Sequence, residues 1–355
     1  MNRPSDEPGR PELSIVVPVY NEEPVIAELD KRLRATLSSL GMTWEAIFVD
    51  DGSTDRSLQL LTALAAEERG YRIIALSRNF GHQIAITAGL DHASGDAVVV
   101  MDADLQDPPE VVAEMVARWR EGFDVVYGVR LAREAETIFK RASAALFYRL
   151  TRRVAGIDIP VDTGDFRLMG RNVVLALRGL RETHRFVRGL VVWVGFKQTA
   201  VRYKREGRYA GSTKYPLTKM VRFAVDGITS FSVVPLRVSS YLGVASGVVA
   251  LALAGWALYT KFYVRGVVQG WTSMLIVISL VAALQFFMIG VLGEYVGRIY
   301  EEVKRRPLYV IRERTNLPQG VRDASRQGDR HLEATPGSAQ GGAAGANAQA
   351  GDQLA

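Results

Sequence analysis

Two long stretches near the C-terminal end of the chain contain no charged residue, and they limit the possible folds more than any other feature. They cover residues 238–260 and 266–293 of the 355-residue chain. Each exceeds the roughly 20 apolar residues that a helix needs to cross a bilayer. A helix in the core of a soluble protein would seldom stay uncharged for so long. We therefore expect two transmembrane helices, at residues 238–260 and 266–297, that form a hairpin.

Basic residues around these stretches predict the orientation of the hairpin. They are frequent on both outer flanks, whereas the connector carries only Lys261 and Arg265. The flanking residues are Lys214, Lys219, Arg222 and Arg237 before the first stretch and Arg298, Lys304, Arg305, Arg306, Arg312 and Arg314 after the second. Because cytoplasmic loops are enriched in lysine and arginine, both ends of the hairpin and both termini are expected on the cytoplasmic side of an inner or plasma membrane.

Residues 13–128 alternate between strand-like and helix-like patterns. Apolar runs at 13–20, 46–49, 71–76, 97–101 and 123–128 predict strands, and the segments between them place apolar residues at helical spacing. Such alternation predicts an α/β domain with an open, mostly parallel sheet and helices on both faces. We assign this domain to residues 13–214. Polar tails at 1–12 and 318–355 are expected to be disordered, and residues 298–317 are expected to form a basic cytoplasmic segment.

Polar residues directly follow three of the predicted strands. Tyr20-Asn21-Glu22 follows the first, Asp50-Asp51 the second and Asp102-Ala103-Asp104 the fourth. Open parallel sheets bind ligands beyond the carboxyl ends of their strands, so these turns are expected to meet at one site. Neighbouring carboxylates repel one another unless a cation lies between them. Asp-X-Asp can hold Mg²⁺ or Mn²⁺, which usually shares its ligands with substrate phosphates.

Several classes of site are excluded or disfavoured by what the sequence lacks. The chain has no cysteine, which rules out disulfides, thiolate metal sites and thiol nucleophiles. Its four histidines show no metal-ligand spacing, which disfavours zinc. No Gly-X-Gly-X-X-Gly or P-loop motif occurs, which disfavours dinucleotide cofactors and P-loop phosphate binding. The net charge of +6 fits a membrane surface, phosphate-bearing substrates or nucleic acid, and the hairpin and acidic sheet edge make nucleic acid a remote partner.

Further segments each allow two interpretations. Residues 137–155 have a basic amphipathic pattern, which suits a helix in the membrane interface or a surface helix packed on its own domain. Asp162 and Asp165, on either side of Gly164, suit an active-site loop or an ordinary capped turn. The Gly-Ser segment between Arg208 and Lys214 could wrap phosphates or lead to the membrane, and residues 215–237 continue as an interfacial helix or linker.

Together these features resemble the family 2 glycosyltransferases. The closest resemblance is to their membrane-bound polyprenyl-phosphate branch, which includes relatives of dolichol-phosphate mannose synthase and bacterial undecaprenyl-phosphate glucosyltransferases. The motifs lie at residues 14–22, 49–55, 79–82, 101–109, 164–167 and 208–215, in the family's order. The resemblance covers about residues 12–310 and implies a GT-A fold, in agreement with the predicted sheet.

The resemblance implies roles for individual residues. A divalent metal, Mg²⁺ or Mn²⁺, on the donor diphosphate would be held by Asp102, Asp104 and Gln106. The donor nucleotide would be bound by Pro18, Tyr20, Glu22, Asp51, Asp102 and Ala103. Phosphate groups would be bound by Arg208, Ser212, Lys214 and Arg130, with Arg130 at the acceptor. The expected catalytic residues are Asp165, Arg208 and Asp104, and Asp165 would either orient a sugar hydroxyl or act as a base.

The resemblance also implies an activity. It implies inverting, metal-dependent transfer of one sugar from a nucleotide-sugar to polyprenyl phosphate at the cytoplasmic membrane face, for the cell envelope. UDP-glucose and undecaprenyl phosphate are favoured, with UDP-N-acetylglucosamine and GDP-mannose as alternative donors. Relatives that form tetramers imply a homo-oligomer.

Two competing interpretations remain. The first is a non-catalytic membrane interaction protein with the same fold, and the intact Asp102, Asp104, Asp165 and Arg208 argue against it. The second is a processive polysaccharide synthase. It is disfavoured because a Gln-X-X-Arg-Trp motif is missing and two spanning helices are too few for a polymer channel.

Overall fold

The computed structural model describes residues 10–131, 163–205, 234–263 and 270–317. Several predicted features lie outside these ranges. They are the amphipathic pattern at 137–155, the Gly-Ser segment with Arg208, Ser212 and Lys214, nearly all of 215–237, and the C-terminal tail. The boundaries assigned to these segments stay predictions.

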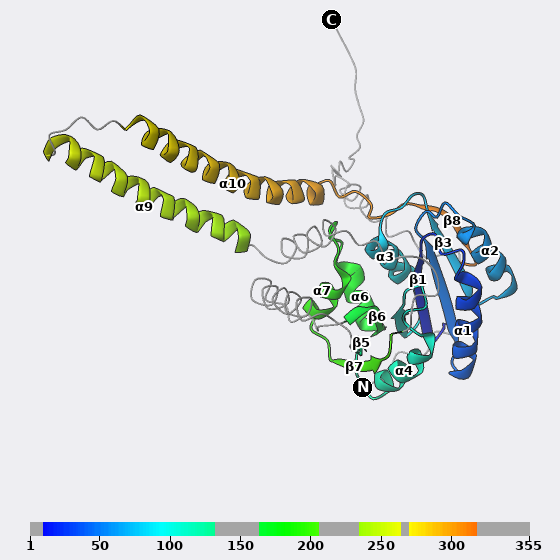
Figure 1. Ribbon diagram of the computed structural model, residues 1–355. Coiled ribbons are helices and arrows are strands. Elements are labelled where there is room, and N and C mark those ends of the chain that lie inside the picture. Colours follow the sequence, from blue (N-terminus) through cyan, green and yellow to red (C-terminus); the bar gives the residue numbers. More distant parts are fainter. Residues whose placement is uncertain (1–9, 132–162, 206–233, 264–269, 318–355) are drawn as a thin grey trace, which may run out of the picture. The chain divides into compact units, whose positions relative to one another are not determined.

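Eight of the described strands form one mixed sheet, in the order β7-β5-β6-β4-β1-β2-β3-β8 (Figure 1). The strands are β1 Leu13–Val19, β2 Trp44–Asp50, β3 Tyr71–Leu76, β4 Ala97–Val100, β5 Val125–Arg130, β6 Thr163–Gly170, β7 Gln198–Tyr203 and β8 Ile311–Thr315. Strands β4, β1, β2 and β3 run parallel, as do β5 and β7, whereas β6 and β8 run antiparallel to their neighbours. The predicted mostly parallel sheet is confirmed.

Helices cover both faces of this sheet. They are α1 Ile26–Ser39, α2 Ser57–Glu67, α3 His82–His92, the 3₁₀-helix η1 Pro109–Val111, α4 Val112–Arg120, α6 Arg171–Gly179 and α7 Val187–Trp193. Apolar side chains of α1, α2 and α4 belong to one core layer, and those of α3, α6 and α7 to the other. In β1, Ile15 and Val17 face the first layer and Val16 the second, because successive strand residues face opposite sides. This arrangement agrees with the expected GT-A fold.

The topology brings the three predicted polar turns to one edge of the sheet. Strands β4, β1 and β2 are parallel neighbours, so their carboxyl ends lie side by side. Each turn contains a residue with positive φ: Asn21 at 55°, Gly52 at 72° and Leu105 at 56°. A Cβ on Gly52 would lie 2.6 Å from the backbone carbonyl carbon of Arg78, so this turn requires glycine. Arg305 and Asn316, away from this edge, also have positive φ, but a left-handed leucine is costly, which makes the turn at Leu105 notable.

Two long helices, α9 Val234–Tyr263 and α10 Trp271–Val303, pack against each other (Figure 1). Within them, Leu236–Leu253 and Leu280–Val303 are long and apolar enough to cross a membrane. Only 6% and 0% of these two segments are buried, whereas a core helix of a soluble protein would be mostly buried. The pair therefore fits the predicted hairpin. Helix α10 continues beyond residue 297, the predicted end of the second spanning helix.

The chain returns to the sheet after α10, a feature that the sequence analysis did not predict. Strand β8 pairs antiparallel with β3 and forms an edge of the sheet. The Tyr309 hydroxyl donates to Asp91 Oδ2 at 2.8 Å, and Asn316 Nδ2 donates to the carbonyl of Ala65 at 2.6 Å. The segment at 298–317, predicted only as basic and cytoplasmic, thus contains the end of α10 and a strand of the α/β domain.

Candidate active site

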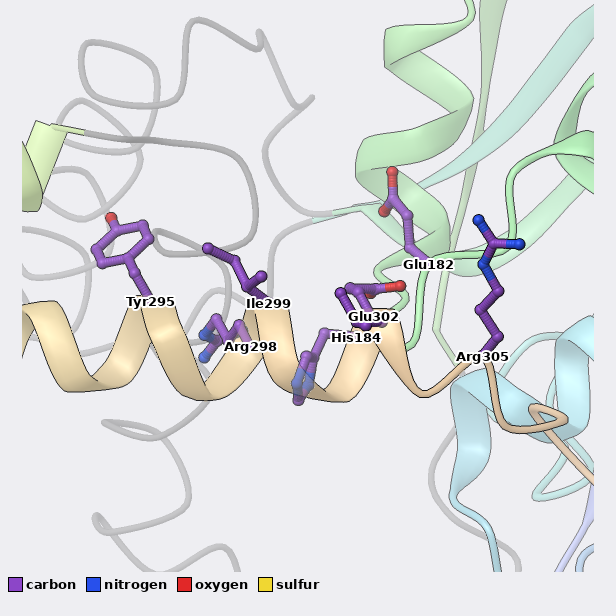
Figure 2. Close-up of a pocket in the computed structure, with 8 residues that line it drawn as sticks. Glu182, His184, Tyr295, Arg298, Ile299, Glu302 and Arg305 are labelled. Atoms are coloured by element: carbon purple, nitrogen blue, oxygen red, sulfur yellow. The ribbon is translucent and has the colours of Figure 1, made fainter.

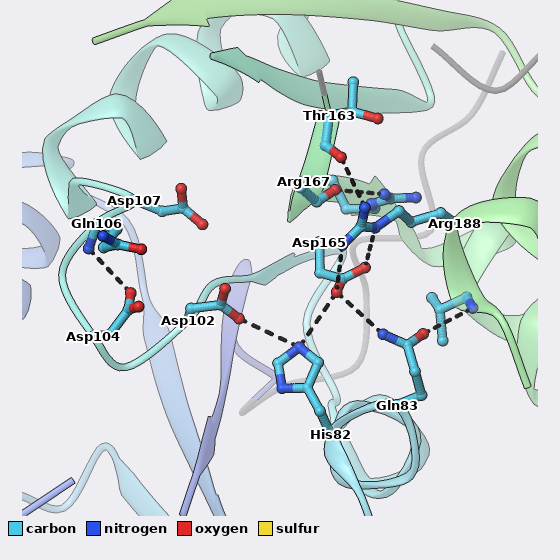
Figure 3. A network of polar contacts seen from close by, with 12 residues as sticks. His82, Gln83, Asp102, Asp104, Gln106, Asp107, Thr163, Asp165, Arg167 and Arg188 are labelled. Atoms are coloured by element: carbon cyan, nitrogen blue, oxygen red, sulfur yellow. Dashed lines mark hydrogen bonds and ion pairs between the residues drawn. The ribbon is translucent and has the colours of Figure 1, made fainter. Parts of the chain in front are cut away.

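The turn after β4 presents the two carboxylates that the Asp-X-Asp pattern singled out. The apolar run of β4 ends at Val100, and Asp102 and Asp104 follow at the edge of the sheet, each partly exposed (Figure 3). Asp104 Oδ1 accepts a hydrogen bond from the backbone N–H of Gln106 at 3.1 Å. This contact and the left-handed Leu105 shape the turn so that the two carboxylates lie close together.

Asp165 lies opposite this turn, on β6, and is only 5% exposed. Arg188 of α7 donates to it twice, from Nε to Oδ1 at 2.8 Å and from Nη2 to Oδ2 at 3.1 Å. Gln83 Nε2 also donates to Oδ2, at 3.1 Å. His82 Nε2 lies 3.3 Å from Oδ2 and 3.4 Å from Asp102 Oδ1 (Figure 3). The imidazole of His82 therefore bridges the carboxylates that come from β6 and from the turn after β4.

The electrostatic environments of these carboxylates differ. Burial raises the pKa of Asp102 to about 6; nearby His82 lowers it, and the carboxylates around it add to the increase. Burial acts in the same direction on Asp165, but the hydrogen bond from His82 and the charge of Arg188 outweigh it, so the pKa of Asp165 falls far below its ordinary value. Burial lowers the pKa of His82, but the hydrogen bond to Asp165 and the charge of Asp102 raise it above the ordinary value.

The donor atoms at this edge fit a divalent cation shared with phosphates. Asp107 Oδ2 is a buried atom without a hydrogen-bond partner, and Asp102 Oδ1 has no hydrogen bond beyond its 3.4 Å ion-pair contact with His82. Such atoms are costly unless a ligand satisfies them. Among the described residues, no three His, Asp or Glu side chains are grouped to hold a metal alone. Magnesium typically takes one or two carboxylates and completes its shell with water and substrate phosphates. Asp102 and Asp104 meet that requirement.

Asp107, which received no role from the sequence, holds Arg130 and Tyr203 in place. It is fully buried, and its Oδ1 accepts hydrogen bonds from the Tyr203 hydroxyl and, at 3.4 Å, from Arg130 Nη2. Arg130 Nε also donates to the Tyr203 hydroxyl at 3.2 Å. A Cβ on Gly164 would lie 2.6 Å from Arg130 Nη2, so glycine at this position makes room for the guanidinium group. The predicted phosphate-binding Arg130 is therefore held near the carboxylates, against the backbone of β6.

Four of the six residues predicted to bind the nucleotide lie around the ends of β1 and β2, and Asp102 and Ala103 follow β4. Pro18 is buried within β1, whereas Tyr20 is 46% exposed and Glu22 partly exposed in the following turn. Asp51 is buried, and its two oxygens accept hydrogen bonds from the backbone N–H groups of Phe80 and Gly81 at 2.7 and 2.9 Å. Asp51 thus fixes the loop that leads into α3 and His82.

Two of the remaining predicted site residues lie in the turn after β4, and three lie outside the described residues. Ala103 is buried between the two carboxylates of the turn. The side-chain carbonyl of Gln106 accepts a hydrogen bond from Arg205, and Gln106 is 9% exposed. Its role as a metal ligand stays a prediction. Arg208, Ser212 and Lys214 lie outside the described residues, so the structure does not test their phosphate-binding role.

Besides Asp107 and Tyr203, three residues of the site received no role from the sequence: His82, Gln83 and Arg188. The motif at residues 79–82 contained His82 and could have identified it, and Gln83 follows directly. Arg188 lies in no motif and comes 23 residues after Asp165. Only the fold brings α7 next to β6.

A cavity of about 670 Å³ lies where the loop before α7 meets the end of α10 (Figure 2). The residues that line it are Glu182, His184, Tyr295, Arg298, Ile299, Glu302, Val303 and Arg305. The backbone N–H of Thr183 donates to Glu302 Oε1 at 2.7 Å, and His184 Nε2 lies 2.6 Å from Glu301 Oε2. None of the predicted site residues lines this cavity, so it is distinct from the carboxylate edge.

Comparison with known proteins identifies the family. Residues 14–177 match the family model described as glycosyl transferase family 2. The chain is 49% identical over 319 residues to the uncharacterized glycosyltransferase YkcC of Bacillus subtilis, covering 90% of this chain and 98% of that protein. It is 40% identical over 300 residues to the bactoprenol glucosyl transferase of Shigella phage SfII, covering 84% and 97%.

A solved structure is also similar, more distantly. Glucosyl-3-phosphoglycerate synthase of Mycobacterium tuberculosis, in complex with Mn²⁺, UDP and glucosyl-3-phosphoglycerate, is 20% identical with a TM-score of 0.41. That match covers 62% of this chain and 78% of the synthase. The full-length sequence relatives suffice: the chain belongs to glycosyl transferase family 2, as the sequence analysis predicted, and is related over most of its length to bactoprenol glucosyl transferases.

Proposed function

We propose that this protein transfers one sugar from a nucleoside-diphosphate sugar to polyprenyl phosphate at the cytoplasmic face of a membrane, with inversion at the anomeric carbon. The observation that carries the proposal is the combination, in one chain, of a carboxylate edge suited to a metal-bound diphosphate and an apolar two-helix hairpin. The relatives named bactoprenol glucosyl transferase support a polyprenyl acceptor and make UDP-glucose the preferred donor.

The chemistry of such a transfer suits the residues at the site. A phosphate oxygen of the acceptor attacks the anomeric carbon, and the nucleoside diphosphate leaves. Because the acceptor is already anionic at neutral pH, the reaction needs little help from a general base. Positioning two anionic substrates and neutralising the leaving group account for most of the expected rate enhancement.

Each part of the site then has a task. Asp102 and Asp104 would hold the Mg²⁺ or Mn²⁺ ion that neutralises the diphosphate, and the metal supplies charge stabilisation to the leaving group. Tyr20, Glu22 and the surrounding turn would bind the nucleoside. Arg130, held by Asp107 and Tyr203, would bind the acceptor phosphate, with Arg208, Ser212 and Lys214 on the remaining phosphate groups.

The hairpin supports a membrane-bound acceptor. A polyprenyl chain lies within the bilayer, so its phosphate is presented at the headgroup layer. Basic residues on both flanks of the hairpin favour a cytoplasmic orientation of the α/β domain. We propose that both termini and the site face the cytoplasm, where nucleotide-sugars are available, and that the protein acts as a homo-oligomer.

The test is sugar transfer by detergent-purified protein to a short polyprenyl phosphate. Labelled UDP-glucose, UDP-N-acetylglucosamine and GDP-mannose would be compared, each with Mn²⁺, with Mg²⁺ and with EDTA. We expect a lipid-linked monosaccharide from UDP-glucose, with the β anomer as product, abolished by EDTA. The absence of a lipid product from every donor would contradict the proposal, and a product from another donor would correct the sugar alone.

A further inference from the structure

Arg188 makes more contacts with β6 than a simple ion pair requires. Its Nε and Nη2 donate to the two oxygens of Asp165, and its Nη1 donates to the carbonyl of Thr163 at 3.0 Å. Paired N–H groups on a carboxylate fix geometry as well as charge. The guanidinium group is therefore held on β6 by three of its nitrogens, and it holds the Asp165 carboxylate in one orientation.

Gln83 of α3 connects Asp165 to the start of α7. Its amide nitrogen donates to Asp165 Oδ2, and its side-chain oxygen accepts a hydrogen bond from the backbone N–H of Val187 at 3.0 Å. Val187 is the first residue of α7 and directly precedes Arg188. The first turn of α3, strand β6 and the start of α7 are thus joined in one polar network (Figure 3).

This network leaves Asp165 poorly suited to accept a proton. Three contacts converge on Oδ2, from Arg188, Gln83 and His82, and Oδ1 is bonded to Arg188. An ionised carboxylate offers about four lone-pair positions. What Asp165 can still do is orient its neighbours, above all His82, which lies between it and Asp102.

We infer that Arg188 is a positioning residue for sugar transfer, which acts by fixing Asp165, and through it His82, beside the Asp102 carboxylate. The inference rests on the proposed function and extends it to a part of the chain beyond residues 14–177, the region that matches the family model. Arg188 and Asp165 then form one unit, so losing either has the consequence of losing both.

A double-mutant comparison tests this. Arg188→Gln, Asp165→Asn and the double variant would be assayed for kcat, for KM of the nucleotide-sugar and for UDP affinity. We expect each single change to lower kcat about 100-fold, as misplacement of a reacting group does, while KM and UDP affinity change less than about threefold. The double variant should be no slower than the slower single variant, because residues that act as a unit are not additive. Losses that multiply in the double variant would overturn the inference.

Two further variants separate positioning from general stability. Arg188→Lys keeps the charge without the paired geometry, and we expect it to recover about a tenth of wild-type kcat. Arg178→Gln is the matched control, because Arg178 donates to the backbone carbonyl of Leu90 at 2.9 Å, away from the carboxylates. It should lower the melting temperature and leave kcat per folded molecule unchanged. If Arg178→Gln lowers kcat as much as Arg188→Gln does, the role of Arg188 is structural and the inference fails.

The inference and the proposed function fail in different ways. A wild-type protein that transfers no sugar from any donor contradicts the proposed function. A wild-type protein that transfers sugar, with Arg188→Gln at wild-type kcat, contradicts only the inference about Arg188.

Discussion

A buried aspartate paired with a partly exposed arginine lies at each end of helix α3, and the two pairs have different surroundings. At the N-terminal end, Asp165 and Arg188 meet His82 and Gln83, and two nearby carboxylates retain oxygen atoms without a hydrogen-bond partner. At the C-terminal end, Asp91 accepts hydrogen bonds from Arg181 at 2.8 and 2.9 Å and from Tyr309 at 2.8 Å. The second pair is satisfied by the protein itself.

The comparison shows how a structural charge pair differs from a functional one. Around Asp91, hydrogen bonds from Arg181 and Tyr309 satisfy the carboxylate and tie α3 to the segment after α10. Around Asp165, the carboxylates of Asp102, Asp104 and Asp107 are added within a short distance, and burial raises the pKa of Asp102. Positive charge at this end comes from Arg188, Arg167 and His82. What sets this end apart is the pair of carboxylate oxygens without a hydrogen-bond partner, which suits the proposed metal ion.

The largest expected effect is at the metal site. Asp104→Asn removes one carboxylate of the Asp-X-Asp turn and keeps its size, so we expect sugar transfer to fall by about 1000-fold or more, since a bound metal contributes several kcal/mol to transition-state stabilisation. The melting temperature should stay within about 2 °C of wild type. Initial rates over a Mn²⁺ titration measure sugar transfer, and thermal unfolding of the same preparation measures the melting temperature. Normal turnover with a normal metal response would remove Asp104 from the site.

The opposite result is expected at the other end of α3. Asp91→Asn leaves Arg181 without its charged partner, and we expect a loss of about 2 kcal/mol in the free energy of unfolding, less than for a fully buried pair because the Arg181 side chain is 34% exposed. Transfer per folded molecule should be unchanged. Thermal unfolding and an activity assay on the same sample compare the two quantities. A loss of kcat in Asp91→Asn at wild-type stability would contradict a purely structural role for Asp91.

Loss of the hydrogen bond between Tyr309 and Asp91 should have a smaller effect on stability. Tyr309→Phe removes one hydrogen bond to Asp91 and keeps the ring, so a stability loss of about 1 kcal/mol is expected. The effect should largely disappear when Asp91 is already asparagine, because the two residues share one interaction. Unfolding of the four proteins of this cycle provides the measurement. Fully additive losses would mean that Tyr309 stabilises the chain by other contacts.

The smallest expected effect concerns pH. Because the pKa of Asp165 is far below its ordinary value, Asp165 stays ionised across the working range, and its charge contributes to stability above the unfolded-state pKa of about 3.9. That contribution is lost only as pH falls below this value towards the folded-state pKa. Asp165 also raises the pKa of His82, and its charge adds to the increase in the pKa of Asp102. Both effects make the stability that Asp165 confers decrease as pH rises, so the difference in melting temperature between wild type and Asp165→Asn should be largest near pH 5 and fall towards pH 8. A difference that stays constant over this range would show that Asp165 is not coupled to His82 and Asp102.

The sequence predicted those parts of the site that are encoded locally. Asp102 and Asp104 directly follow a buried strand, and a parallel sheet must bring the ends of β4, β1 and β2 together, so residue order alone indicated the shared edge. Arg188 and Gln83 could not be inferred in this way, because their contacts with Asp165 depend on how α7 and α3 pack on β6. Strand β8 was missed because Ile-Arg-Glu-Arg-Thr has a charged centre and no apolar alternation, as suits an exposed edge strand.

One assay compares the two ends of α3 most directly. Wild type, Asp104→Asn and Asp91→Asn would be tested for transfer of labelled glucose from UDP-glucose to undecaprenyl phosphate, each with Mn²⁺ and with EDTA. We expect lipid-linked glucose from wild type and Asp91→Asn only with Mn²⁺, and almost none from Asp104→Asn under either condition. Equal product from all three proteins in EDTA would contradict the claim that the carboxylate edge after β4 is a metal-dependent site of sugar transfer.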